Sequence, residues 1–168
     1  MKDSIIQFKT KLEYNRELKA LLALKKYNID FTVQYLKSYD QTNTIHIVYD
    51  RNIPSLDDIL NTSVIPLAKR KMYWKQIQNM IRVLHMYNFS HGDFNSKNIL
   101  VTKKDKLILC NFHLSIVDCK DPDIMKQDKK NALFIFYQLH CNEKNKKEQE
   151  FQNDLLNILS NNIMTLSI

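Results

Sequence analysis

The spacing of hydrophobic residues changes twice within the first fifty positions. Residues 12–28 carry leucines near helical spacing, which predicts a helix with one buried side. The preceding "SIIQFK" and the following "FTVQYLKSYD" and "TNTIHIVYD" are rich in β-branched and aromatic residues. They predict three strands, with "DQTN" as the turn between the last two. The leucines expected on the buried side of the helix are Leu12, Leu18, Leu21, Leu22 and Leu24.

The remainder of the chain is mostly helical in pattern. Ser55 is expected to cap a short helix, and Pro66 to open a long one. "NILVT" and "KLILCNF" predict a β-pair around a polar turn, and helical patterns follow from about Gln127 and over 148–162. Because strands and helices occupy separate zones, the pattern predicts an α+β fold. The buried positions expected in the long helix are Ile77, Met80, Ile81 and Leu84.

Composition narrows the class of protein. A chain of 168 residues that is 44% hydrophobic and 26% charged can bury a core, and we expect one compact domain with two unequal lobes. The formal net charge of +7 favours nucleic acid or acidic partners, although short lysine clusters of this kind are more typical of solvated surface. Cys110, Cys119 and Cys141 form no zinc-binding pattern. Cys110 lies in an apolar run, where a small buried thiol is expected.

The apolar runs and the cysteine count of the chain indicate where in the cell it is expected. The first fifteen residues have no long apolar core, and no apolar run approaches the length that spans a bilayer. An odd number of cysteines without a disulfide framework is typical of a reducing compartment. We therefore expect a soluble protein that is cytoplasmic, nuclear or both, not secreted, and without a membrane partner.

One constellation of polar residues carries candidate chemistry. His91-Gly92-Asp93 is followed by Asn98, five residues after the aspartate, and Asn111-Phe112 begins thirteen residues later. The loop follows the predicted long helix, and the predicted β-pair separates its two halves. The alternative is a polar loop in an asparagine-rich chain. Gly92, the only glycine of the chain, lies at the centre of this constellation.

This spacing resembles the catalytic loop of protein kinases, H-x-D-x-x-x-x-N, with the metal-binding D-F-G that follows it. The resemblance implies a kinase-like fold with a reduced β-containing N-lobe, residues 1–50, and a mainly helical C-lobe, residues 51–168. It implies Asp93 as the catalytic carboxylate beside the acceptor hydroxyl. Asn98 and Asn111 are the implied ligands of Mg²⁺ and of the phosphates of ATP.

The resemblance extends to the N-lobe and to the helix expected from about Gln127. Glu17 resembles the glutamate of the kinase αC helix, with Glu13 as a rival, and Lys9 resembles the strand lysine that pairs with it. An ordinary exposed lysine is an equal interpretation of Lys9. Asp128 resembles the aspartate that opens the core helix of the large lobe, where it would brace the catalytic loop from behind.

Among kinase-like families, the chain most resembles the small kinase-like subunit of the KEOPS complex, which modifies tRNA. That family has HGDLTTSN, then DFGLS, then a short connection to E-D-K-A-V-D-L-Y. The counterparts here are HGDFNSKN, NFHLS and Q-D-K-K-N-A-L-F, with fifteen residues between Phe112 and Asp128. The resemblance implies two protein partners, the threonylcarbamoyl-transfer subunit and a small bridging subunit, and contact with tRNA through the complex.

Several departures weaken the implied chemistry. A glycine-rich loop is absent, so the first two strands of the small lobe are missing or supplied by another molecule. Asn111 replaces the D-F-G aspartate, which removes a charge from the metal site. His113 replaces its glycine and either contacts a phosphate or is structural. The apolar ending "NNIMTLSI" replaces a basic tail and is expected to pack on the core or against a partner.

Three interpretations remain open at the level of sequence. The first is an atypical serine/threonine kinase or ATPase of the KEOPS type, with weak binding of ATP and Mg²⁺. The second is a pseudokinase that acts as a protein-binding scaffold or as a regulator of another kinase. The third is an unrelated α+β domain, which a structure without a strand end at Asn111 near Asp93 would favour.

Overall fold

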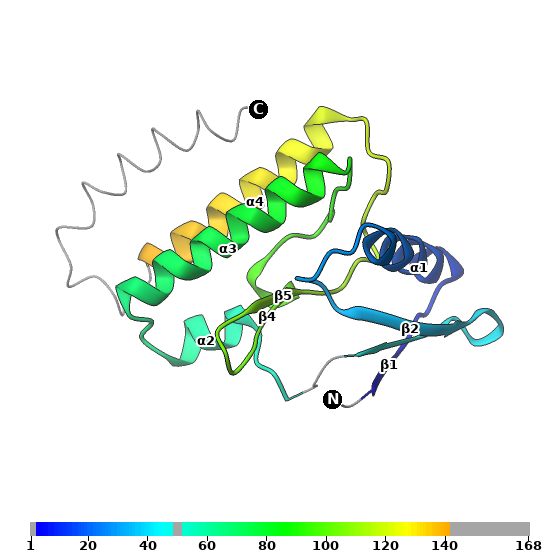
Figure 1. The fold of residues 1–168 in the computed structure, drawn as a ribbon, viewed down its shortest axis with the longest axis horizontal. Helices are drawn as coiled ribbons and strands as arrows, with labels where there is room; N and C mark the ends of the chain where they lie inside the picture. The colour runs from blue at the N-terminus through cyan, green and yellow to red at the C-terminus, as the bar shows by residue number, and fades with distance from the viewer. Residues whose placement is uncertain (1–2, 49–51, 142–168) are drawn as a thin grey trace.

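The computed structural model describes residues 3–48 and 52–141 and has an α+β architecture (Figure 1). A small sheet with one helix forms one end of the molecule, and three helices with a second β-pair form the other. The elements in chain order are β1 (Asp3–Gln7), α1 (Lys11–Lys26), β2 (Gln34–Tyr39), β3 (Thr44–Val48), α2 (Leu56–Thr62), α3 (Leu67–Met86), β4 (Ile99–Val101), β5 (Leu107–Leu109) and α4 (Pro122–Cys141).

The N-lobe sheet is antiparallel, with the strand order β1-β3-β2. The three predicted strands are confirmed, and the predicted turn between the last two is a 3-10 turn at Asp40–Thr42. Ser4 pairs with Ile47 and Ile6 with Ile45, so these four side chains share the face that packs toward α1. Among the described strands β1 is an edge, with β3 as its one neighbour.

The helix α1 begins at a capping box. The Thr10 hydroxyl accepts a hydrogen bond from the Glu13 backbone, and the Glu13 carboxylate accepts one from the Thr10 backbone. The predicted buried side is partly wrong, since Leu12 and Leu22 are 60% and 46% exposed. At 3.6 residues per turn these two leucines lie away from the face that packs on the sheet. That face consists of Tyr14, Glu17, Ala20, Leu21 and Leu24.

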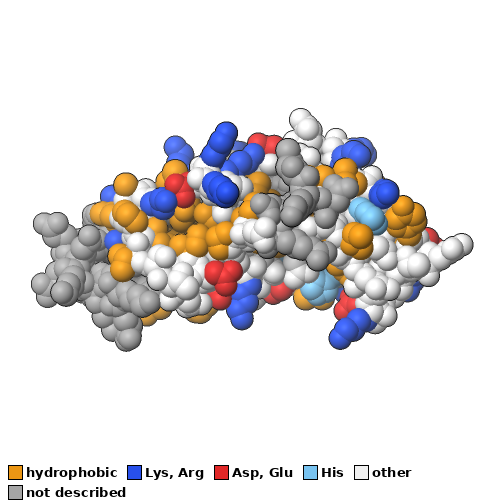
Figure 2. All heavy atoms as spheres, turned by 90° about the horizontal axis from the view of Figure 1, so that it is seen from below, with side chains coloured by type: hydrophobic (Ala, Val, Ile, Leu, Met, Phe, Trp, Pro, Cys, Tyr) orange, Lys and Arg blue, Asp and Glu red, His pale blue; other side chains and the backbone are white. Residues whose placement is uncertain are grey.

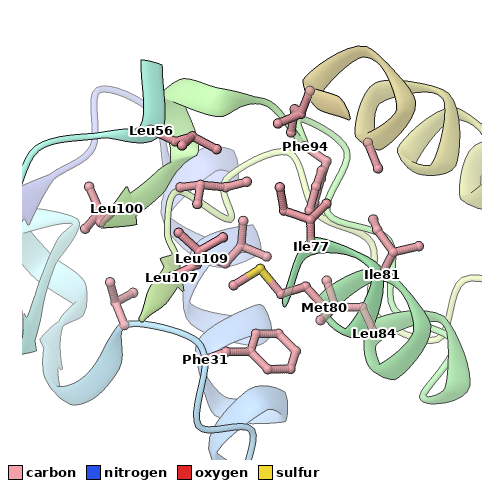
Figure 3. Packing of buried hydrophobic residues seen from close by; sticks show 14 of the residues in the cluster. Phe31, Leu56, Ile77, Met80, Ile81, Leu84, Phe94, Leu100, Leu107 and Leu109 are labelled. Carbon is pink, nitrogen blue, oxygen red and sulfur yellow. The ribbon is translucent and has the colours of Figure 1, made fainter. Parts of the chain in front are cut away.

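The helices α2 and α3 confirm the predicted starts. Ser55 caps α2, accepting from the Asp58 backbone at 3.1 Å while the Asp58 carboxylate accepts from the Ser55 backbone at 2.9 Å. Pro66 directly precedes α3, where a missing N–H leaves no helical hydrogen bond unmade. The four positions predicted to be buried in α3 are all buried. Figure 3 shows Ile77 and Met80 pointing toward Leu107 and Leu109 of β5.

The helix α4 begins five residues earlier than predicted. Pro122 occupies its first position, and the Asp121 carboxylate accepts a hydrogen bond from the Asp123 backbone at 2.9 Å. The prediction from about Gln127 was wrong because it depended on where the apolar pattern becomes dense. Asp128 therefore lies in the second turn rather than at the opening of the helix. The predicted helix over 148–162 and the apolar ending lie outside the described residues.

The two lobes are joined at β5. The Leu109 backbone donates to Phe31 at 2.8 Å and accepts from Val33 at 3.1 Å, so the segment before β2 continues the C-lobe β-pair. The buried side chains of both lobes form one contiguous cluster. The predicted boundary between the lobes, at residues 50 and 51, falls in a stretch that is not described. Within 3–48 and 52–141, no helix combines the length and apolar character needed to cross a bilayer.

Candidate active site

The loop that carries His91-Gly92-Asp93 is fixed from behind by Asp128 of α4. One oxygen of the Asp128 carboxylate accepts from the Ser90 hydroxyl and the His91 backbone, each at 2.8 Å. The other accepts from the Gly92 backbone at 3.1 Å. Burial acts to raise the pKa of Asp128, but the nearby donors, His85, Ser90 and His91, outweigh burial and hold this pKa below its usual value. The predicted bracing role of Asp128 is thus matched by its contacts.

Gly92 is required by the close approach of another segment. It adopts a left-handed φ of +78°, and a Cβ built at this position would lie 2.3 Å from the carbonyl oxygen of Leu114. Leu114 is held there because Ser90 and Ile116 exchange two backbone hydrogen bonds, at 3.0 and 2.9 Å. The sequence showed a single glycine in a polar loop, and the structure gives the steric reason for it.

His91 connects this loop to the end of β5. Its Nδ1 accepts from the Asp93 backbone at 3.2 Å, and its Nε2 lies 3.1 Å from the carbonyl oxygen of Cys110. This pattern requires a neutral ring with the proton on Nε2. Burial lowers the pKa of His91, which favours the same neutral form. His91 is therefore a structural residue of the site.

Asp93 presents its carboxylate at the centre of the loop. Oδ1 accepts a hydrogen bond from the Asn95 side-chain amide, and Oδ2 accepts one from the Asn98 side-chain amide, each at 2.8 Å. The Asn98 amide also donates to the Asp93 backbone carbonyl at 2.8 Å. These bonds hold the carboxylate in one orientation, and each oxygen keeps lone-pair capacity for a further donor.

Asn111 lies directly against Asn98, as the resemblance to the kinase catalytic loop implied. The Asn111 side-chain nitrogen donates to Asn98 Oδ1 at 3.1 Å, and Asn111 Oδ1 lies 2.6 Å from Nδ1 of His113. Asn111 adopts a left-handed φ of +67°, which asparagine tolerates better than most residues. A continuous chain of hydrogen bonds thus runs from His113 through Asn111 and Asn98 to Asp93. The third interpretation, an unrelated α+β domain, does not agree with this juxtaposition.

Glu17 of α1 also faces this region. Its side chain is fully buried, and its two oxygens have no hydrogen-bond partner among the described residues. Burial raises the pKa of Glu17 to about 8, and the nearby backbone amide of Phe112 offsets only part of that rise. Glu13, its rival in the sequence, is held in the cap of α1 instead. The geometry therefore selects Glu17 as the buried glutamate of the site.

Lys9 lies apart from Glu17. It follows the end of β1 by two residues, its side chain is exposed, and the described residues hold no ion pair between it and Glu17. The structure therefore does not place Lys9 within the strand, contrary to the resemblance. Ser4 and Ile6 occupy the inward face of β1, so its described positions offer Glu17 no cation. A role for Lys9 in nucleotide binding stays a prediction.

Comparison with known proteins identifies the fold family. The model of the lipopolysaccharide kinase (Kdo/WaaP) family matches residues 11–149, which is most of the chain. The chain belongs to this family. Cyclin-dependent kinase-like 5 of mouse is 28% identical over 99 residues, and its human counterpart is 28% identical over the same length. That stretch covers 58% of this chain and 10% of each relative, so the chain spans about a tenth of their length.

The kinase-like resemblance is confirmed by this membership, and the two comparisons do not concern the KEOPS subunit. Kdo/WaaP kinases and their relatives generally bind ATP and Mg²⁺. Magnesium prefers one or two carboxylates in addition to phosphate oxygens. Here Asp93 is the one acidic residue of the hydrogen-bonded chain, and the described ranges contain no cluster of three or more histidine, cysteine or acidic residues.

The amide oxygens of Asn98 and Asn111 are the remaining candidates as ligands. Asn98 Oδ1 is engaged by the Asn111 nitrogen, so a half-turn of the Asn111 amide is needed to bring the two oxygens together. Two neutral oxygens hold a free divalent ion weakly. The residues of this Kdo/WaaP-family member therefore fit Mg²⁺ that is bound mainly by the phosphates of a nucleotide, and they do not fit free Mg²⁺.

Proposed function

We propose that this chain is a slow ATP-dependent phosphotransferase or ATPase of the atypical serine/threonine kinase type. The observation that carries this proposal is the Asp93 carboxylate, held by 2.8 Å hydrogen bonds from Asn95 and Asn98 on a loop that Asp128 anchors. Such a rigid arrangement is what a positioned general base requires.

The residues act in distinct ways at this site. Asp93 would orient a serine or threonine hydroxyl, or a water molecule, and accept its proton through the free lone pairs of Oδ1 and Oδ2. Asn95 and Asn98 would keep the carboxylate in place as the proton moves. ATP would supply the phosphoryl group, with Asn98 and Asn111 as neutral oxygen ligands of its metal ion. Because Asn111 carries no charge, transition-state stabilisation is weaker, and turnover is slow.

The proposed setting is a KEOPS-type complex that supports threonylcarbamoyladenosine formation in tRNA. Two features support it: the HGD form of the loop and the fifteen residues that separate Phe112 from Asp128. This segment returns to Ser90 through Ile116, and α4 then begins at Pro122, which leaves little length for a docking segment for protein substrates. The proposed partners are the threonylcarbamoyl-transfer subunit and a small bridging subunit, with tRNA contacted through the complex.

A second candidate function is that of a pseudokinase that acts as a protein-binding scaffold or kinase regulator. The bond from Asn111 to Asn98 Oδ1 favours this candidate, because it occupies the oxygen that a metal ion would need. In this case the site would be retained for its shape rather than its chemistry.

Nucleotide binding separates the two candidates. ATP would be titrated into the purified chain with and without Mg²⁺ by calorimetry, with Asp93→Ala as the test variant and Asp123→Asn, an exposed change, as the matched control. The phosphotransferase proposal predicts weak binding that Mg²⁺ strengthens, together with hydrolysis that Asp93→Ala abolishes. Absence of binding at millimolar ATP would refute it and favour the pseudokinase.

Membership of a KEOPS-type complex is tested separately. The tagged chain would be expressed in its own cell type, and the proteins that copurify would be identified by mass spectrometry. The proposal predicts recovery of the threonylcarbamoyl-transfer subunit from both the wild type and Asp93→Ala. If that subunit is not recovered while the chain remains folded and soluble, the assignment to such a complex is wrong, whatever the outcome of the ATP titration.

A further inference from the structure

A cavity of about 340 Å³ lies in the C-lobe between α2, the start of α3 and the turn from β4 to β5. Figure 2 shows this face of the molecule, where hydrophobic side chains gather between lysine and arginine side chains. Val64, at the cavity, is 63% exposed. Its apolar lining includes Pro54, Ile59, Val64, Ile65 and Val101.

The polar lining of this cavity is positively charged. Lys69 and Lys103 both contribute to it, and Asp105 is the one carboxylate among the lining residues. Asp105 is already engaged, since it lies 2.8 Å from the Lys69 ammonium and accepts a hydrogen bond from the Tyr73 hydroxyl at 2.7 Å. Lys103 is exposed and has no ion pair among the described residues. The cavity therefore suits apolar side chains that are flanked by carboxylates.

The described part of the chain ends close to this cavity. α3 and α4 pack side by side in opposite directions, so the last turn of α4 lies next to the first turns of α3 (Figure 1). The Phe136 ring connects them, because its centroid lies 4.7 Å from that of Trp74 in α3 and 4.4 Å from that of His140 in the last turn of α4. Lys69 of the same turns lines the cavity. A further 27 residues follow Cys141 in the sequence.

This following sequence has the chemistry that the cavity suits. Residues 148–159, EQEFQNDLLNIL, contain three carboxylates, no lysine or arginine, and a cluster of large apolar residues after Asp154. We propose that residues 148–159 dock into this cavity within the same chain. Their carboxylates then face Lys103, and their leucines and isoleucine contact the apolar lining. The connecting residues 142–147 reach about 20 Å when extended, and a short tether raises the local concentration of the segment.

Carbodiimide cross-linking of the full chain tests this proposal. The reagent joins lysines to carboxylates that are in contact, and mass spectrometry identifies the pairs. An equal mixture of unlabelled and ¹⁵N-labelled chains distinguishes a link within one chain from a link between two. The expected product is a link from Lys103 or Lys69 to residues 148–154, within one chain. Links between chains would overturn the proposal in favour of a second copy as the occupant.

Substitutions at the exposed residues Lys103 and Val64 test the docking further and are not expected to disturb the fold. Lys103→Glu is expected to reduce the links from Lys69 about tenfold, which corresponds to about 1.4 kcal/mol of lost docking, and Glu150→Lys in the same chain is expected to restore them. Val64→Asp is expected to reduce them similarly, because it introduces a charge against the apolar side chains. Lys19→Glu, on the exposed side of α1, is the matched control and should change nothing. Yields that are unchanged by both Lys103→Glu and Val64→Asp would overturn the proposal.

Discussion

The buried carboxyl of Glu17 makes the stability of this protein depend on pH in a direction opposite to that of most acidic groups. Its pKa is about 8 in the folded chain, against an ordinary value of 4.5 for a glutamate in water. Below pH 4.5 the group is protonated in both states and costs nothing. Between pH 4.5 and 8 the unfolded chain ionises while the folded chain stays protonated, so stability falls as the pH rises. Above pH 8 both states are ionised, and the loss is complete.

The size of this effect follows from the same shift. Each pH unit between 4.5 and 8 removes about 1.4 kcal/mol, which amounts to about 3 kcal/mol at pH 7. Glu17→Gln keeps the shape of the side chain, but it cannot ionise. We therefore expect this variant to be about 3 kcal/mol more stable than the wild type at pH 7 and about equally stable at pH 4.5.

The assay is urea unfolding at half-unit steps from pH 4.5 to 8, followed by the fluorescence of Trp74, the single tryptophan. Glu13→Gln is the matched control, because glutamine also completes a capping box and Glu13 is in the same helix. Its difference from the wild type should not vary with pH. A Glu17→Gln variant that is less stable than the wild type at pH 7.5 would contradict this prediction. That result would mean that a cation pairs with Glu17 and keeps it charged.

Three further predictions concern the loop and the metal ligands. Gly92→Ala should destabilise the chain by about 2 kcal/mol or more, because its Cβ meets the Leu114 carbonyl, and urea unfolding would show no change if this contact were unimportant. Asp128→Asn should cost about 2–4 kcal/mol and release the loop, measured as faster hydrogen exchange of the Gly92 amide; unchanged exchange would contradict its bracing role. Asn111→Asp should strengthen binding of Mn²⁺ in the presence of ATP by about tenfold or more, measured by electron paramagnetic resonance, because a carboxylate replaces a neutral amide. Equal Mn²⁺ affinity in both chains would show that Asn111 is not a ligand.

Local signals in the sequence were sufficient for most of the fold. Ser55 followed by Asp58, and Pro66 before an apolar stripe, each satisfy a helix start with residues only a few positions apart. Strand pattern and turn residues likewise defined the sheet. The buried side of α1 was predicted less well. It contains Glu17 and excludes Leu12, whereas hydrophobicity alone predicts an exposed glutamate and a buried leucine.

For the candidate site too, some features could be predicted from the sequence and others could not. The juxtaposition of Asp93, Asn98 and Asn111 was implied by the resemblance of their spacing to the catalytic loop and D-F-G of protein kinases, and the hydrogen bonds among the three residues agree with it. The steric need for Gly92 was not visible, because it depends on Leu114, a residue brought close only by tertiary pairing. The position of Lys9 depended on where β1 ends, which a short edge strand does not specify in its sequence.

The most direct test of the proposed phosphotransferase is a measurement of ATP turnover by the purified chain. Release of labelled phosphate would be followed under saturating Mg²⁺ for the wild type, Asp93→Ala, Asn111→Asp and the surface control Asp123→Asn. The account predicts slow turnover in the wild type and the control, none above background in Asp93→Ala, and faster turnover in Asn111→Asp. Equal turnover in the wild type and Asp93→Ala would contradict it.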